Sequence, residues 1–235
     1  MRKLLLEHLE AFVGLFYPRL CLCCEINQPA DDDGLCIPCA ARLPKTDLHL
    51  HAENEFTERF WGRIPLQAGA AMLYFRKQGF TQLLMHQLKY EGNRELGKSL
   101  GKTFGRMLQR SPFFEGIEGV VPVPLHPAKE RLRGYNQSAV FAEGLAEVWG
   151  LPVWKNALRR TVHTPSQTRL SRMERLENVR RVFQVAEPGS LRGRHILLVD
   201  DVLTTGATLE ACAEKILALE GTRVSMATLA IAMDF

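Results

Sequence analysis

Five of the six cysteines lie within nineteen residues, and their spacing is typical of a metal site. Cys21 and Cys24 form one C-x-x-C pair, and Cys36 and Cys39 form a second pair after eleven intervening residues. In such a pair, both thiolates of a tight turn can face one ion. Two pairs complete the tetrahedral site of structural zinc. We therefore predict that these four cysteines bind zinc.

The spacing leaves the second ligand open, because Cys23 could replace Cys24. A disulfide pair, redox thiols and an iron–sulfur cluster are the alternatives to zinc. Disulfides are uncommon in a cytosolic chain, and no strand-to-helix pattern of the redox kind surrounds these cysteines. Zinc would also stabilise a segment of about 40 residues, which is too short to be stabilised by a hydrophobic core alone. Cys212 falls in a predicted helix, where we expect it to be buried.

A phosphate site is predicted where an apolar run, residues 195–199, leads into Asp200 and Asp201, a small turn at 204–208 and a helix. Backbone N–H groups of a turn at a helix N-terminus can converge on a phosphate, which the helix dipole also favours. Threonine hydroxyls add donors. The two carboxylates could face sugar hydroxyls or a hydrated Mg²⁺. A phosphate site beside carboxylates that accept from two sugar hydroxyls fits the ligand ribose 5-phosphate.

A rival phosphate motif lies at residues 92–99, which match the P-loop pattern G-x-x-x-x-G-K-[ST]. A P-loop follows a buried strand, whereas a helical pattern precedes this segment, and Glu95 inside it would repel phosphate. We interpret Lys98 as a solvated helix residue. A P-loop NTPase remains the weaker alternative, supported by the resemblance of residues 196–200 to a Walker B strand.

The elements that must position these residues alternate in type. Apolar strands are predicted at 68–75, 119–124, 195–199 and 223–233, and amphipathic helices at 80–90, 94–109, 136–150 and 207–221. Such alternation predicts an α/β fold, a mainly parallel sheet covered on both faces. Ligands bind such sheets at the carboxyl ends of the strands.

Length and composition set the domain organisation. With 235 residues, 46% hydrophobic and 24% charged, the chain is ordinary globular material, not a disordered or fibrous sequence. We predict a helix and zinc ribbon at 1–45, a linker at 46–65 and the sheet domain at 66–235. The net charge of +4 is uneven, with residues 1–60 acidic and the remainder basic, which suits a phosphate-bearing ligand.

The first eighteen residues predict a short amphipathic helix rather than a signal peptide, because Glu7, His8 and Glu10 interrupt the apolar run. No apolar run reaches about 18 residues, so we expect no transmembrane helix. The expected location is the cytoplasm.

The phosphate segment resembles the motif of type I phosphoribosyltransferases, D-D-x-x-T-T-G-x-T, without departure over residues 200–208. The wider chain is similar to the ComF family, also called the GntX or amidophosphoribosyltransferase-like family. The segments that carry this resemblance are the cysteine ribbon, 88–90, 121–138 and 164–183. One departure concerns the ribbon, where Glu25 and Ala40 stand at positions that often hold glycine.

The resemblance implies a type I phosphoribosyltransferase fold and a role for each motif residue. Asp200 and Asp201 would hold the ribose hydroxyls and, indirectly, Mg²⁺. Residues that would cradle the 5-phosphate are Thr204, Thr205, Gly206, Ala207 and Thr208. Cations after the 119–124 strand, Lys129, Arg131 and Arg133, would face pyrophosphate. The segment 159–181 carries seven arginines and resembles the loop that closes over substrate in this fold.

Two functions follow from the resemblance. The first is an Mg²⁺-dependent phosphoribosyltransferase that uses phosphoribosyl pyrophosphate and an acceptor that the sequence does not identify. The second is a non-catalytic protein that handles nucleotides or single-stranded DNA during DNA uptake, with competence proteins as partners. The oligomeric state stays open between a monomer and the homodimer that is common among related folds.

Overall fold

The computed structural model describes residues 18–30, 34–160 and 182–233. The chain divides into two compact units, Met1–Leu43 and Pro44–Phe235. In the first unit, a turn-rich segment leads to helix α2 (Ile37–Ala41). The helix predicted for the first eighteen residues lies outside the described part, apart from its last residue.

The segment predicted as a linker, 46–65, belongs to the second unit. It contains the 3₁₀ turn η1 (Leu48–Leu50) and helix α3 (Glu55–Glu58), which Asn54 caps by accepting from the backbone N–H of Phe56 and of Thr57. Phe56 and Phe60 are fully buried. The domain therefore begins earlier than predicted, because these aromatic side chains are part of its core.

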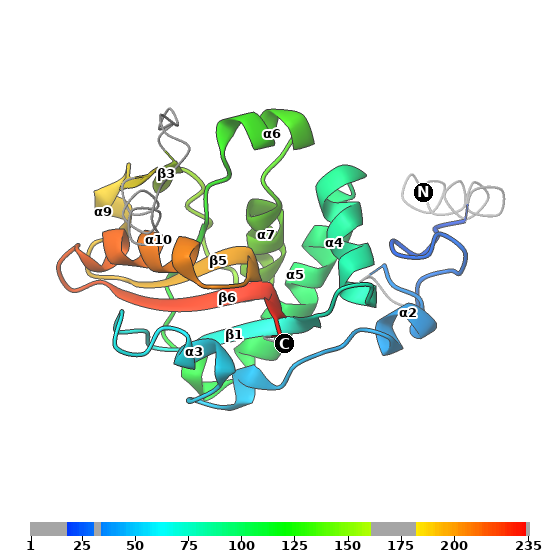
Figure 1. The fold of residues 1–235 in the computed structure, drawn as a ribbon, viewed down its shortest axis with the longest axis horizontal. Helices are drawn as coiled ribbons and strands as arrows, with labels where there is room; N and C mark the ends of the chain where they lie inside the picture. Colours follow the sequence, from blue (N-terminus) through cyan, green and yellow to red (C-terminus); the bar gives the residue numbers. More distant parts are fainter. Residues whose placement is uncertain (1–17, 31–33, 161–181, 234–235) are drawn as a thin grey trace, which may run out of the picture. The chain divides into compact units, whose positions relative to one another are not determined.

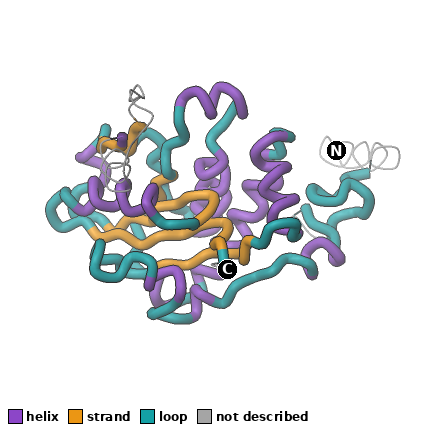
Figure 2. Tube along the Cα trace, viewed as in Figure 1, coloured by secondary structure: helices purple, strands orange, loops and turns teal. Residues whose placement is uncertain are grey.

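A four-stranded parallel sheet forms the centre of the second unit, in the order β1-β6-β5-β2. Figure 2 shows these strands in orange within the surrounding helices. Their bounds are β1 (Gly69–Phe75), β2 (Gly119–Pro122), β5 (His195–Leu203) and β6 (Arg223–Ala232). A separate antiparallel pair joins β3 (Leu158–Arg160) to β4 (Phe183–Val185). The predicted α/β fold is confirmed.

Helices connect and cover these strands (Figure 1). Those predicted from periodicity are α4 (Phe80–Tyr90), α5 (Arg94–Gln109), α7 (Gln137–Trp149) and α10 (Ala207–Leu217). Short helices not predicted are η2 (Pro112–Phe114), α6 (Pro127–Arg133) and α9 (Pro188–Leu191). No helix in the described ranges is both long and apolar enough to cross a membrane.

The core lies on both faces of the sheet. Successive side chains of a strand point to opposite faces, yet His195 to Val199 of β5 and residues 224–231 of β6 are buried without interruption. Both faces of these central strands are therefore covered, as in other parallel sheets. This burial holds rigid the strand from which the predicted phosphate site extends.

Helices α5 and α7 pack unusually closely through two glycines. A Cβ atom built on Gly101 would lie 2.2 Å from the carbonyl oxygen of Phe141, and one built on Gly144 would lie 2.0 Å from that of Lys98. The backbones of α5 and α7 approach each other at these two glycines, which carry no side chain. This contact fixes α7, whose first turn carries a residue of the site described next.

Candidate functional sites

The predicted phosphate turn, residues 204–208, connects the end of β5 to the start of α10. Gly206 is the N-cap of α10 and has a left-handed φ of 81°. A Cβ atom there would also lie 3.0 Å from the ring of Phe60. Glycine is therefore required by conformation and by space. The turn encloses a small cavity of about 40 Å³, lined by Asp200 and residues 202–209, at the positive end of the helix dipole.

Two arginines near α3 support this turn from the side. Arg59 donates from Nη1 to the carbonyl oxygen of Thr204 and from Nη2 to that of Ala232 at the end of β6, the latter at 2.6 Å. Arg63 pairs with Glu210 in the first turn of α10, with 2.8 Å between Nη1 and Oε2. Glu210 is only 3% exposed, so this pair anchors the helix that follows the turn.

The two aspartates at the end of β5 face different partners. Asp200 accepts at Oδ1 from the Ser138 hydroxyl and from the Asp201 backbone N–H, each at 2.8 Å. Burial, together with the neighbouring charge of Asp201, raises the pKa of Asp200 to about 7. Asp201 Oδ2 lies 2.8 Å from Nζ of Lys89 on α4. The pair thus combines one carboxylate that resists ionisation with one that is bound to a cation.

A cleft of about 210 Å³ opens over these carboxylates. Among the predicted site residues it brings together Asp200, Asp201, Thr208, Lys129 and Arg133. Its other lining residues are Lys89, Val123, Pro124, Leu125, Asn136, Gln137, Ser138 and Arg160. Arg131 lies outside this lining, on the exposed surface of α6. Arg160 is the one arginine of the predicted lid segment that lines the cleft within the described residues; positions 161–181 lie outside them.

Sequence reasoning missed several of these residues. Lys89 and Ser138 stand in the motifs at 88–90 and 121–138, yet neither was given a role. Asn136 caps α7 and donates from Nδ2 to the carbonyl oxygen of Val123 at 2.9 Å, which ties the loop after β2 to the helix. A polar cap at the start of a helix that follows a buried strand is a signal that could have identified this residue.

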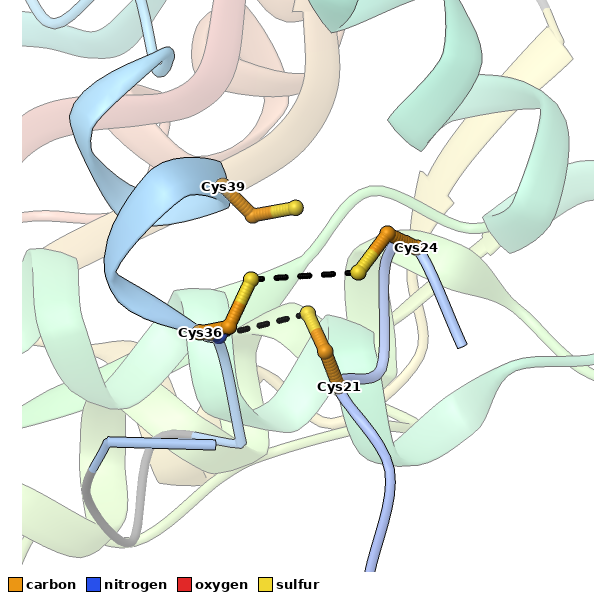
Figure 3. Close-up of side chains that lie close together, drawn as sticks. All are labelled: Cys21, Cys24, Cys36 and Cys39. Atoms are coloured by element: carbon orange, nitrogen blue, oxygen red, sulfur yellow. Dashed lines mark hydrogen bonds between the residues drawn. The ribbon is translucent and has the colours of Figure 1, made fainter. Parts of the chain in front are cut away.

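The four predicted metal ligands converge in the first unit. Figure 3 shows the side chains of Cys21, Cys24, Cys36 and Cys39 directed toward one point. All four sulfurs lie within 4.8 Å of one another, and those of Cys24 and Cys36 are 3.8 Å apart. Four sulfurs held tetrahedrally at about 2.3 Å from zinc would be about 3.8 Å apart. The cluster therefore has the ligand type and nearly the spacing of a zinc ribbon.

Cys24, rather than Cys23, completes this cluster. Backbone N–H groups of Asn27 and Ile26 lower the pKa of Cys24 to about 6, whereas burial raises the pKa of Cys23 to about 11. The choice of Cys24 rests on geometry, because burial also raises the pKa of Cys39, which belongs to the cluster.

The departures from glycine in the ribbon have different consequences. Glu25 takes a left-handed φ of 55°, a conformation that glycine adopts more easily. Ala40 lies inside α2, where no such conformation is needed. The first turn thus keeps its shape with a non-glycine residue, and the second continues as a helix.

Comparison with known proteins shows which proteins the chain resembles. Residues 137–234 match the phosphoribosyl transferase domain. "Competence protein F" of Haemophilus influenzae is 25% identical over 203 residues, 83% of this chain and 89% of the relative. "Competence protein ComFC" of Bacillus subtilis is 24% identical, over 87% of this chain and 91% of the relative. The chain is thus similar to these competence proteins along most of its length. "DNA utilization protein YhgH" of Escherichia coli O157:H7 is 29% identical, over 86% and 92% of the two chains.

In this chain the P-loop match does not form a phosphate loop. Residues 92–99 follow helix α4, and from Arg94 onward they are the first turns of α5. Lys98 points to Glu147 of α7, with 2.8 Å between Nζ and Oε2, and this pairing raises the pKa of Lys98. A P-loop needs a buried strand before it, so residues 92–99 do not form one.

Proposed function

We propose that this protein binds the ribose 5-phosphate group of phosphoribosyl pyrophosphate and transfers it to an acceptor. One observation carries the proposal: the glycine turn at 204–208 and the carboxylates of Asp200 and Asp201 adjoin one cleft that is also lined by cations. The turn offers backbone N–H groups to a phosphate. The carboxylates offer acceptors to the ribose hydroxyls. A phosphate site and hydroxyl acceptors side by side match the two ends of ribose 5-phosphate.

The cations of the cleft suit the departure of pyrophosphate. In the transfer, the bond from ribose C1 to the pyrophosphate oxygen breaks with its electron pair, and a bond from C1 to the acceptor forms. Lys129, Arg133 and Arg160 would stabilise the charge that develops on the leaving oxygen. The turn and the aspartates would hold the ribose while C1 carries positive charge.

Asp200 and Asp201 also match the hard oxygen ligands that Mg²⁺ prefers, directly or through water. When bound, Mg²⁺ would supply charge neutralisation for the pyrophosphate group. Lys89 already balances the charge of Asp201. We therefore assign the ribose hydroxyls to Asp200 and Asp201 as their main ligand, and the hydrated ion as their secondary ligand.

Calorimetry with phosphoribosyl pyrophosphate and Mg²⁺ tests the binding step. We expect the wild type to bind and Asp201→Asn to weaken binding by at least about tenfold, a loss of roughly one charge-assisted hydrogen bond. Asp47→Asn, which alters an exposed carboxylate outside the cleft, is the matched control. Release of pyrophosphate across a panel of bases and amines then tests transfer. A wild type that binds neither phosphoribosyl pyrophosphate nor ribose 5-phosphate would falsify the proposal.

A role in handling nucleotides or single-stranded DNA is the second candidate, supported by relatives named as competence and DNA utilization proteins. Phosphate contacts by Lys129, Arg131 and Arg133 would make DNA affinity fall steeply with salt. Fluorescence anisotropy with a single-stranded oligonucleotide measures this slope, and a flat response argues against DNA binding by these cations.

We propose further that the cysteine cluster binds structural zinc, supported by the convergence of its four sulfurs. Such a site needs reduced thiols, which supports a cytoplasmic location.

A further inference from the structure

A separate cavity of about 320 Å³ lies where the starts of α5 and α7 meet α6 and the segment before β3. The apolar side chains that line it include those of Leu125, Ala139 and Val140. Its charged lining residues, two of each sign, are Arg94, Lys155, Glu130 and Glu143. The lining is therefore neutral overall, unlike the cation-rich cleft, and it favours a ligand without net charge.

Two of these four charges satisfy each other. Nζ of Lys155 lies 2.5 Å from Oε1 of Glu143. Arg94 and Glu130 form no ion pair with any side chain in the described part of the chain. The Arg94 guanidinium carbon instead lies 5.3 Å from the ring centroid of Tyr135, a buried ring whose hydroxyl donates to a carbonyl oxygen of α4. The cavity thus offers a ligand one cation and one anion.

An α-amino acid matches this arrangement. A planar guanidinium binds a carboxylate through two parallel hydrogen bonds, and an arginine stacked on a fixed aromatic ring is preorganised for this contact. The Glu130 carboxylate can accept from the α-ammonium group. An apolar side chain would then cover Leu125 and Val140 and remove their surface from water. A phosphate-bearing ligand would instead face two carboxylates, and a polyamine would face two cations.

Helix α6 separates this cavity from the cleft. Glu130 and Gly134 line the cavity, whereas Lys129 and Arg133 line the cleft. The residues that line both are Pro124, Leu125 and Asn136. α6 buries none of its side chains and lies away from the sheet (Figure 1). The core therefore does little to fix α6, and a ligand on one side of it can act on the cations at the other side.

We propose that this cavity binds a free α-amino acid with an apolar side chain, and that its occupancy strengthens the binding of phosphoribosyl pyrophosphate in the cleft. The ammonium group would neutralise Glu130, which follows Lys129 on the same short helix and opposes its attraction for an anion. The amino-acid site stands on the cavity alone. Its effect on the cleft rests on the proposed function, in which Lys129 and Arg133 face pyrophosphate.

Calorimetry with L-leucine, L-methionine and L-phenylalanine, each beside its N-acetyl and amide analogues, tests the site. The N-acetyl analogue lacks the ammonium group, and the amide lacks the carboxylate. We expect the wild type to bind at least one amino acid about tenfold more tightly than either analogue, because each analogue loses one charge-assisted contact. Arg94→Gln should remove the preference over the amide only, and Glu130→Gln the preference over the N-acetyl analogue only.

Matched controls use the same substitutions at exposed positions outside the lining. Arg110→Gln, at the other end of α5, and Glu220→Gln should keep both preferences. If none of the three amino acids binds, or if the wild type binds the analogues equally well, the amino-acid site is overturned. Loss of both preferences in the two control variants would also overturn it, because the charges of Arg94 and Glu130 would then have no special role.

Titration of phosphoribosyl pyrophosphate with Mg²⁺ tests the effect on the cleft. A saturating amino acid should raise this affinity severalfold in the wild type, and by linkage phosphoribosyl pyrophosphate should raise the amino-acid affinity by the same factor. Glu130→Gln should bind phosphoribosyl pyrophosphate more tightly without any amino acid. An unchanged affinity overturns the coupling and leaves the site. A wild type that binds no phosphoribosyl pyrophosphate overturns the coupling together with the proposed function, whereas the amino-acid titrations still decide the site.

Discussion

Asp200 shows how one residue of the site acts against the stability of the fold. Its pKa of about 7 lies well above the ordinary value of 3.8, because the carboxyl group is partly buried and faces Asp201. Between these two pH values the folded chain holds a proton that the unfolded chain has released. Stability therefore falls as the pH rises through this range. The fold tolerates this loss where the proposed ligand needs an ionised acceptor.

Removing this charge should stabilise the protein only above that range. We expect Asp200→Asn to raise the melting temperature near pH 8, where the wild-type carboxylate is ionised, and to change it little near pH 4, where it is protonated. Thermal unfolding of both proteins without ligand, in buffers across this range, measures the difference. Asp47→Asn is the control for an exposed carboxylate. A difference that does not vary with pH would contradict the raised pKa.

At the scale of elements, α3 and the residues after it hold the phosphate turn in place. Arg59 bonds to Thr204, Arg63 pairs with Glu210, and Phe60 lies against Gly206. These contacts join a segment near residue 60 to the strand and helix near residue 205. The turn is thus supported by a part of the chain that has no family motif.

Breaking the Arg63–Glu210 pair should destabilise the domain. Arg63→Ala leaves the buried carboxylate of Glu210 without this cation, so we expect a loss of about 1–3 kcal/mol in the free energy of unfolding. Urea unfolding measures this loss. Arg63→Ala combined with Glu210→Gln should recover part of it, since the buried charge is gone. An additive double variant would show that the pair contributes no coupling.

The sequence predicted the long elements well and the short ones poorly. Helices α4, α5, α7 and α10 carry apolar stripes, whereas α6 buries none of its side chains and its Leu132 is 82% exposed. Strands β3 and β4 have three residues each, too few for a visible alternation. The turn at 204–208 was predictable because its residues are contiguous. The pairing of Lys89 with Asp201 was not, because only tertiary packing joins α4 to the end of β5.

At the scale of the whole molecule, the cysteine cluster and the sheet belong to separate compact units. The first unit has about 40 residues, too few for a stable core without a metal. The second has its own buried core on both faces of the sheet. Metal loss should therefore affect the two units unequally.

We expect a strong chelator to unfold the first unit and leave the second folded. Elemental analysis should find about one zinc per chain, lost in Cys36→Ser. Hydrogen exchange should then show lost protection in residues 18–43, while β5, β6 and the binding of ribose 5-phosphate are kept. Cys212→Ser, outside the cluster, is the matched control for zinc content. A metal-free wild type, or loss of the sheet on chelation, would contradict this prediction.

The strand order also has a consequence during synthesis on the ribosome. β1 pairs with β6, so Gly69 cannot form its sheet pair until Met226 has been synthesised. Likewise β2 pairs with β5, so Val120 cannot pair until Leu197 has been synthesised. Before β5 and β6 emerge, the described residues offer these two strands only isolated bridges, Lys45 to Leu73 and Val120 to Val153. Such distant pairing makes folding slow and leaves apolar strands open to aggregation. The nascent chain should therefore depend on chaperones until β6 is complete, and a truncation before Arg223 should be insoluble.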